Sequence, residues 1–188
     1  MLLLLHGTGG DENELLRLGH DLFPSAALLS PRGKVVQDGK SKFLRRTDKG
    51  LFDIEDVRSR SLELVGFIES ASRTYSLKQE HLVVLGYSSG ANMGSALLLL
   101  CPRLLAGAVL FRPGITFIPD ELPDLSNVAV YMAGGLSDHL VQRDQTEKLF
   151  DLLEQCDADV TLNWVNAGHQ ITRGDFPPAR SWLAQHPL

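Results

Sequence analysis

Hydrophobic residues along this chain gather in six short continuous runs rather than in an alternating pattern. Runs of this length without polar alternation are typical of parallel strands whose two faces are both covered. The runs span residues 2–5, 26–30, 81–86, 106–111, 127–133 and 159–165. They predict a mostly parallel sheet.

The stretches between the runs carry apolar residues at helical spacing. Helices are predicted over residues 11–22, 54–75, 89–100, 141–156 and 176–186. The first is expected to begin with a capping box, because Asp11 and Glu14 have the D-x-x-E spacing. Alternating strands and helices predict a three-layer α/β fold, doubly wound with right-handed crossovers. At 188 residues, the chain is expected to form a single domain, 1–188.

Residues 31–54 break the alternation of strands and helices. This segment is polar, basic and interrupted by glycines, and it is long for a loop. Long loops in compact domains are usually functional or disordered. We expect the segment to act as a small cap over the functional site.

Composition and charge narrow the function classes. A hydrophobic content of 44% with 22% charged residues is that of an ordinary globular protein, and the net charge of −5 argues against nonspecific nucleic-acid binding. The apolar start, Leu2 to Leu5, is too short for a signal peptide or membrane span, so a cytoplasmic protein without a membrane partner is expected. Cys101 and Cys156 lack a C-x-x-C pattern and are predicted to be buried or half-buried free thiols.

The pentapeptide GYSSG, residues 86–90, lies between a strand run and a helix run. The G-x-S-x-G elbow exposes its central serine on a sharp strand-to-helix turn, and glycines on both sides prevent crowding. Only Ser88 fits this register, because centring Ser89 would put the bulky Tyr87 at a glycine position. Ser88 is therefore the candidate nucleophile. The alternative is a small-residue helix start with Ser89 as its cap.

A serine nucleophile needs a base, and the base needs an acid that orients it. His169, in NAGHQIT, follows the last strand run and is the candidate base; a solvated loop histidine is the alternative. Asp138, in GGLSD, follows the preceding strand run and is the candidate acid. Asp144 is the second candidate acid, and Asp138 could instead cap a helix.

The tetrahedral oxyanion also needs donors. In this type of site, one is the backbone N–H of the residue after the nucleophile, here Ser89. The glycine-rich loop LHGTGGDE follows the first strand run, and the backbone N–H of Thr8 is the candidate second donor. A phosphate cradle is the alternative for this loop, but it lacks the G-x-x-x-x-G-K-[ST] pattern.

The motifs LHGTGGDE, GYSSGAN, GGLSD and NAGHQIT occur in the order found in one family. Through them the whole chain resembles the phospholipase/carboxylesterase family of α/β-hydrolases, which is related to acyl-protein thioesterases. SPRGKV, FLRR and GLFDIEDV resemble a bacterial branch associated with hydroquinone stress. The resemblance implies an α/β-hydrolase fold, the triad Ser88, Asp138 and His169, an oxyanion hole from Thr8 and Ser89, and neither cofactor nor metal.

The chain departs from the family pattern in three places. Ser89 stands where the family often has glutamine or asparagine, and LFRPGITF replaces a turn that often contains histidine or serine. The strand segment that usually precedes the first strand is missing. Two explanations stay open: a sheet edge that a second chain covers in a homodimer, or a truncated start.

The cap-like segment offers candidate substrate contacts. Phe43 and Phe52 are predicted to form an apolar wall. Arg45 and Arg46 could bind an anionic substrate group or pair with acidic neighbours. A small cap favours short-acyl or aromatic esters as small-molecule substrates, hydrolysed through an acyl-enzyme. The alternatives are a thioesterase or lysophospholipase with the same triad, and a non-catalytic binding module.

Overall fold

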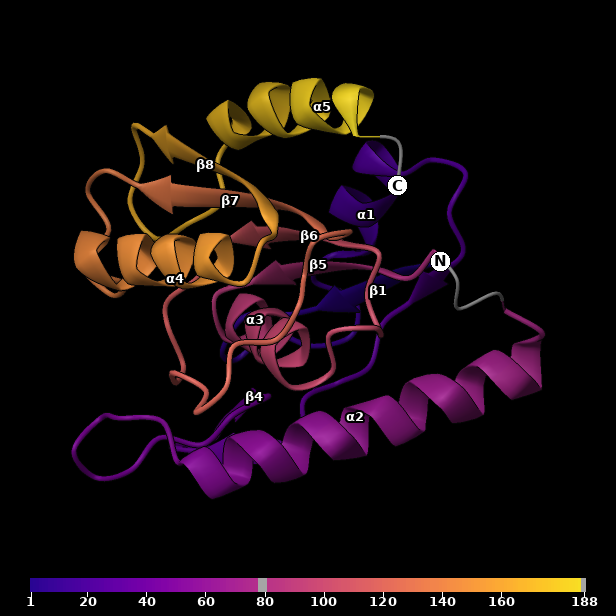
Figure 1. Cartoon of the computed structure of the whole chain (residues 1–188), viewed down its shortest axis with the longest axis horizontal. Helices are drawn as coiled ribbons and strands as arrows, with labels where there is room; N and C mark the ends of the chain where they lie inside the picture. The colour runs from indigo at the N-terminus through magenta and orange to yellow at the C-terminus, as the bar shows by residue number, and fades with distance from the viewer. Residues whose placement is uncertain (78–80, 187–188) are drawn as a thin grey trace.

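The computed structural model describes residues 1–77 and 81–186, and six of its strands form one parallel sheet (Figure 1). The strand order is β2-β1-β5-β6-β7-β8. The strands are β1 (Leu2–Leu5), β2 (Leu28–Leu29), β5 (Val83–Tyr87), β6 (Gly107–Phe111), β7 (Ala129–Gly135) and β8 (Asp159–Val165). Every predicted run contributes a strand, although β2 keeps only two residues of its run. The homodimer over a sheet edge stays a prediction.

Helices cover both faces of the sheet and produce the predicted three layers. One face carries α1 (Leu16–Leu22) and α5 (Phe176–Gln185), which pack together in Figure 1. The other face carries α2 (Ile54–Tyr75), α3 (Ser89–Leu100) and α4 (Arg143–Gln155), and a short 3-10 turn, Arg173–Asp175, precedes α5. The doubly wound α/β architecture is confirmed.

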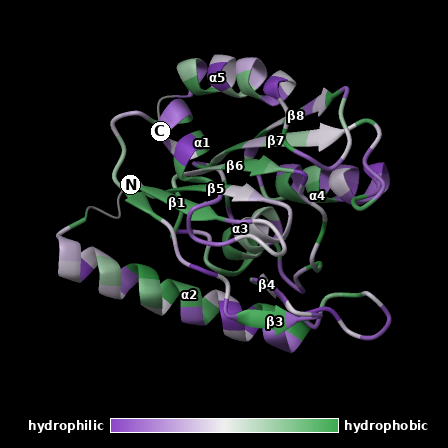
Figure 2. Cartoon of the chain, turned by 180° about the vertical axis from the view of Figure 1, so that it is seen from behind, coloured by the Kyte–Doolittle hydropathy of each residue, from purple (hydrophilic) through white to green (hydrophobic). Residues whose placement is uncertain are grey.

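Strand β1 shows why the apolar runs do not alternate. Leu3 and Leu5 belong to the core beneath α2, α3 and α4, whereas Leu2 and Leu4 belong to the core beneath α1 and α5. All four side chains are fully buried. Figure 2 shows the consequence, with β1, β5 and β6 predominantly hydrophobic and α2 and α5 mixed along their length.

The predicted capping box at residues 11–14 is wrong. Helix α1 begins only at Leu16, and no side chain caps it. The carboxylate of Glu14 instead accepts a hydrogen bond of 2.6 Å from the backbone N–H of Gly7, and Asp11 accepts one from the N–H of Asn13. Glu14, which would have completed the capping box, instead accepts a hydrogen bond from the glycine-rich loop.

Residues 31–54 contain a hairpin that was not predicted. Strands β3 (Val35–Gln37) and β4 (Lys40–Lys42) pair antiparallel around Asp38 and Gly39, whose φ angles are +54° and +69°. Two positive φ angles at Asp-Gly are the signature of a type I′ turn. Ser41 ties β4 to the glycine-rich loop: its carbonyl accepts from the N–H of Gly9 at 2.7 Å, and its hydroxyl donates to Gly10.

The two cysteines agree with the sequence analysis. Cys101 is half-buried and Cys156 is buried, both are free thiols, and burial raises both pKa values. Across residues 1–77 and 81–186, none of the helices combines the length and the apolar character that a membrane crossing requires.

Candidate active site

Ser88 occupies the turn between β5 and α3 with a strained backbone. Its φ is +50° and its ψ is −110°, a conformation that residues with a Cβ rarely adopt. The flanking glycines make this turn possible: a Cβ on Gly90 would lie 1.9 Å from the carbonyl oxygen of Leu5, and one on Gly86 would lie 2.6 Å from that of Gly90. The geometry puts Ser88 at the centre of the elbow.

His169 joins the serine to an aspartate. Its Nε2 lies 2.8 Å from the Oγ of Ser88, and its Nδ1 lies 2.8 Å from Oδ2 of Asp138. The three residues follow β5, β7 and β8, because the carboxyl ends of parallel strands meet at one edge of the sheet. Asp144 lies elsewhere: it is exposed on α4 and pairs with Lys148 at 2.9 Å.

Asp138 is held as a carboxylate. Burial works to raise its pKa, but the backbone N–H groups of Val141 and Leu140 and the ring of His169 together hold the pKa below its ordinary value. Oδ1 accepts from the two amides at 2.8 and 3.0 Å, which leaves Oδ2 for the imidazole. An ionised partner of this kind orients the ring and stabilises an imidazolium.

Two backbone amides border the nucleophile. Neither Thr8 N–H nor Ser89 N–H donates to any residue in the described ranges, and both residues line the cleft that contains Ser88. Ser89 is the first residue of α3, so its amide also belongs to the positive end of the helix dipole. Both amides therefore stay candidate donors to an oxyanion at Ser88.

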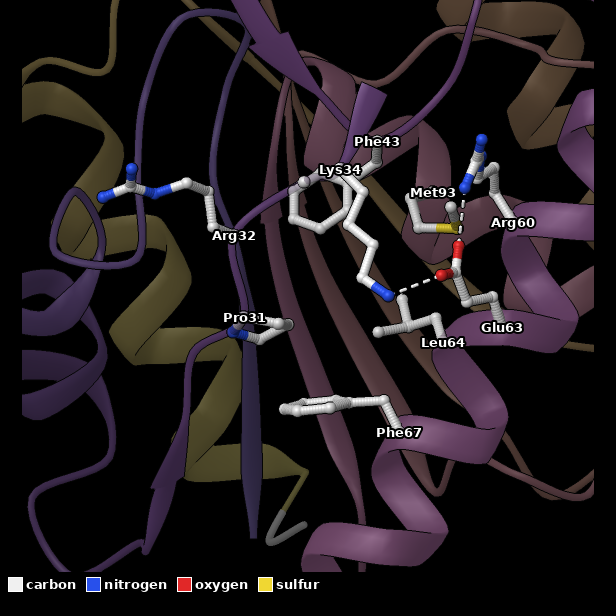
Figure 3. Close-up of a pocket in the computed structure, with 10 residues that line it drawn as sticks. Pro31, Arg32, Lys34, Phe43, Arg60, Glu63, Leu64, Phe67 and Met93 are labelled. Carbon is white, nitrogen blue, oxygen red and sulfur yellow. Dashed lines mark hydrogen bonds and ion pairs between the residues drawn. The ribbon is translucent and has the colours of Figure 1, made fainter. Parts of the chain in front are cut away.

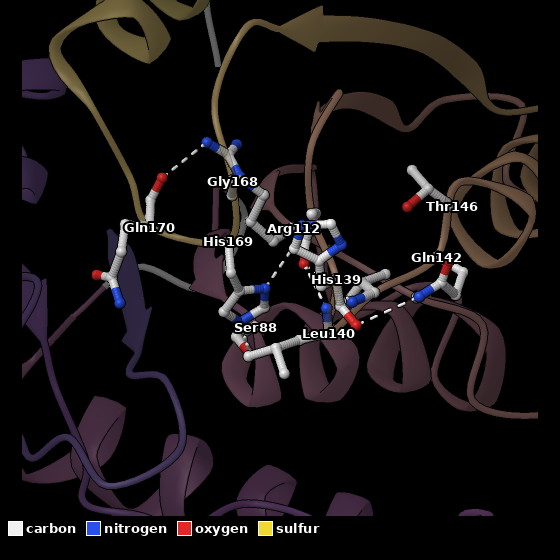
Figure 4. A network of polar contacts seen from close by, with 12 residues as sticks. Ser88, Arg112, His139, Leu140, Gln142, Thr146, Gly168, His169 and Gln170 are labelled. Atoms are coloured by element: carbon white, nitrogen blue, oxygen red, sulfur yellow. Dashed lines mark hydrogen bonds and ion pairs between the residues drawn. The ribbon is translucent and has the colours of Figure 1, made fainter.

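The buried Arg112 is a site residue that the sequence analysis missed. It follows β6, and both its side chain and that of Asp175 are fully buried. Its Nε and Nη2 donate to the carbonyls of Gly168 and Gln170, each at 2.9 Å, on either side of the histidine (Figure 4). The remaining donors reach Asp175 and the carbonyl of Ala133, so all five N–H groups are used.

Tyr87 completes this support. Its hydroxyl donates to the carbonyl of His169 itself at 3.3 Å, and its ring lies 5.5 Å from the imidazole. The carbonyls of Gly168, His169 and Gln170 therefore all accept hydrogen bonds from the side chains of Arg112 or Tyr87. The signal for Arg112 in the sequence was a lone arginine directly after a buried strand run, in LFRPG.

Comparison with known proteins identifies the family. No family model matches the chain. A putative hydrolase, MhqD of Bacillus subtilis, is 37% identical over 185 residues, covering 98% of this chain and 92% of the relative. The chain belongs to the phospholipase/carboxylesterase family of α/β-hydrolases.

Solved structures agree with this assignment. A carboxylesterase from Bacillus cereus is 39% identical, with a TM-score of 0.94 and coverage of 98% of this chain and 87% of that one. A carboxylesterase from Mesorhizobium loti is 31% identical, with a TM-score of 0.90 and coverage of 97% and 87%. This α/β-hydrolase is an ester-hydrolysing enzyme.

The cleft that contains Ser88 in this α/β-hydrolase has a volume of about 670 Å³. A second cavity of about 530 Å³ adjoins it and shares the side chains of Arg46, Phe52, Asn92, Leu140 and Val141. Clefts of several hundred Å³ are the usual size of small-molecule sites. The cap-like segment contributes one wall, with Lys40, Lys42, Leu44, Arg46 and Phe52.

Phe43 and Arg45 do not line this cleft, unlike the prediction. The ring of Phe43 faces a separate cavity of about 200 Å³ against α2, together with Phe67 and Met93 (Figure 3). Only the backbone of Phe43 reaches the site, where its N–H donates to the Oγ of Ser89 at 3.2 Å. Arg45 donates its backbone N–H to Asp56 and is absent from the residues that line the cleft.

Phe52 and Arg46 do line the cleft, and they contact each other. The guanidinium carbon of Arg46 lies 4.0 Å from the centre of the Phe52 ring, and Nη1 donates to the carbonyl of Gly50. The sequence left open whether Arg46 pairs with an acidic neighbour. In the described part of the chain, it forms no ion pair.

Proposed function

We propose that this enzyme is a serine carboxylesterase that hydrolyses short-acyl or aromatic carboxylic esters through an acyl-enzyme intermediate. The observation that carries the proposal is the continuous chain from Ser88 Oγ through His169 to Asp138, with both contacts at 2.8 Å, inside an open cleft. Nucleophile, base and orienting acid are the three parts that acyl transfer requires.

The reaction proceeds in two halves. In the first, Ser88 Oγ attacks the carbonyl carbon of the ester while Nε2 of His169 takes its proton. The charge that develops on the carbonyl oxygen is stabilised by the amides of Thr8 and Ser89. Collapse breaks the bond to the alcohol, which leaves with the proton from Nε2. In the second half, water gives its proton to His169 and attacks the acyl-enzyme, and Ser88 regains a proton as the acid is released.

The choice of esters over thioesters rests on the relatives rather than on the triad. The triad would cleave either bond, since the attacking and leaving steps are the same. Two of the solved relatives are named carboxylesterases, and both share more than 30% of their residues with this chain. A thioesterase remains the second candidate.

Hydrolysis of p-nitrophenyl esters and a matched thioester by the wild type and Ser88→Ala tests the proposal. We expect the wild type to favour the short esters and the variant to lose about 10⁴-fold or more in kcat. A fluorophosphonate probe should label Ser88 in the wild type and nothing in the variant. Full activity of the variant, or a wild type that hydrolyses no ester, would contradict the proposal; preference for the thioester would favour the second candidate.

A further inference from the structure

Three cationic side chains line the cleft beside the nucleophile. They are Lys40, Lys42 and Arg46, and all belong to the cap-like segment. The chain as a whole has a net charge of −5, so a concentration of positive charge at this place is not a consequence of composition. The cleft is therefore positively charged, whereas the whole chain carries a net negative charge.

The fold fixes where these charges lie. Lys40 and Lys42 stand two residues apart on β4, and successive residues of a strand point to opposite faces, so both lie on the same face. Ser41, which lies between them, anchors the strand to the loop that carries Thr8. The two lysines are therefore positioned relative to the oxyanion donor by backbone contacts, not by their own flexible stems.

None of the three cations forms an ion pair within the described ranges. The ammonium of Lys42 donates only to the side-chain carbonyl of Gln37, at 3.3 Å. The situation differs in the separate cavity against α2. There, Lys34 pairs with Glu63, and Arg60 pairs with the same carboxylate.

Among the described residues that line the cleft, one carries a carboxylate, and this carboxylate already accepts a hydrogen bond. Glu14 accepts the N–H of Gly7 at 2.6 Å and forms no ion pair with the three cations. Arg46 is exposed to solvent, and its guanidinium lies over the Phe52 ring at the edge of the cleft, where it forms no ion pair in the described part of the chain. A cation in that position is stabilised by an anion that enters the cleft.

From these contacts we infer that the physiological substrate is an ester that carries a carboxylate, and that Lys40, Lys42 and Arg46 bind this group. The inference rests on the proposed esterase activity and specifies its substrate class. Arg46 lies in both adjoining cavities, so it can contact a carboxylate while the apolar part of the substrate extends along Phe52 and Val141. Its planar fork suits a carboxylate better than a point charge would.

Matched pairs of esters test this inference. On the acyl side, mono-p-nitrophenyl adipate is compared with the isostere in which a methyl ketone replaces the free carboxylate. On the alcohol side, meta-acetoxybenzoate is compared with meta-acetoxyacetophenone. With rates corrected for spontaneous hydrolysis, we expect kcat/KM of the charged ester to exceed that of its partner about tenfold on at least one side. This preference should shrink as salt rises, because exposed charges are screened.

Variants assign the preference to the cations. Lys40→Met, Lys42→Met and Arg46→Met should each lower the ratio of kcat/KM for the charged ester to kcat/KM for its neutral partner about threefold to fivefold, as expected for partly exposed pairs. Lys42→Glu should reverse the preference, and Arg46→Lys should restore part of what Arg46→Met removes. The control is Lys148→Met on the exposed face of α4, which changes the net charge equally and should leave the preference intact.

The outcomes distinguish failure of the inferred substrate class from failure of the proposed esterase activity. Equal hydrolysis of charged and neutral esters, or an equal loss in Lys148→Met, would overturn the inference while the esterase activity stands. A wild type that hydrolyses none of the esters would overturn both.

Discussion

At the scale of single residues, the two serines of the elbow have different tasks. Ser88 presents its hydroxyl to His169, whereas Ser89 turns its hydroxyl to the backbone of Phe43 and lines the cleft beside Thr8. The side chain of Ser89 thus fastens the cap-like segment to the elbow.

Asp138 makes the stability of the enzyme depend on pH. Its pKa is lower in the folded state, so its contribution to stability is present above the unfolded value of about 3.9 and disappears as the pH falls through the folded value. Asp138→Asn keeps an acceptor for the amides of Leu140 and Val141 but has no charge to lose.

We therefore expect wild type to be more stable than Asp138→Asn at pH 6 and the difference to shrink on acidification to about pH 3. The free energies of unfolding from urea titrations at several pH values measure this difference. Asp144→Asn, which changes an exposed carboxylate on α4, serves as the comparison. A difference between wild type and Asp138→Asn that stays constant over this range would contradict the assignment.

At the scale of elements, the loop after β8 is positioned by a buried ion pair. Arg112 and Asp175 neutralise each other in a fully buried place, and Arg112 spends its other donors on backbone carbonyls of the loop and of β7. Breaking one partner of such a pair leaves an uncompensated buried charge. The loop therefore depends on a residue more than fifty positions away in sequence.

Two variants separate positioning from stability. Arg112→Met removes the carbonyl contacts and strands Asp175, so we expect a loss of about 3–5 kcal/mol in the free energy of unfolding and a fall in kcat of tenfold or more. Asp175→Asn also breaks the ion pair, but the guanidinium still donates to Gly168 and Gln170.

Asp175→Asn should therefore lose stability and keep most of its kcat. Thermal unfolding gives the stability, and ester hydrolysis measured below the onset of unfolding gives kcat. If both variants lost kcat in proportion to stability, Arg112 would be a structural residue only.

The elements that could be predicted from sequence are those fixed by local pattern. Helix α2 has the predicted bounds because its periodicity is strong and Asp53 accepts the N–H of Asp56 at its start. The predicted start of helix α1 is wrong because Glu14 accepts a hydrogen bond from the N–H of Gly7, which lies outside the predicted helix. The β3–β4 hairpin was predictable in principle, since Asp38-Gly39 is a strong turn signal.

At the scale of the whole molecule, the topology explains why residues from three parts of the sequence could be predicted to meet. Ser88, Asp138 and His169 all follow strands of one parallel sheet, and such strands end at a common edge. Side-chain directions within the irregular segment had no such constraint. Phe43 therefore faces α2 instead of the cleft.

The same sheet joins two cores that could otherwise unfold separately. Alternate residues of each central strand belong to the core under α2, α3 and α4 or to the core under α1 and α5. A strand cannot lose its packing on one face while remaining fixed on the other, because both faces share one backbone. The two cores should unfold in a single cooperative transition.

The two tryptophans report on opposite faces of the sheet. Trp182 on α5 is buried in the α1 and α5 core, whereas Trp164 on β8 lies beneath Arg143 of α4, at 4.8 Å. In urea, Trp164→Phe retains Trp182, so its fluorescence transition reports on the face covered by α1 and α5. Trp182→Phe retains Trp164, so its fluorescence transition reports on the face covered by α4. Each should coincide with the far-UV circular dichroism transition of the same variant, since either face can open only when the shared strands separate. A fluorescence midpoint that precedes the dichroism midpoint in Trp164→Phe would show that α1 and α5 leave the sheet first.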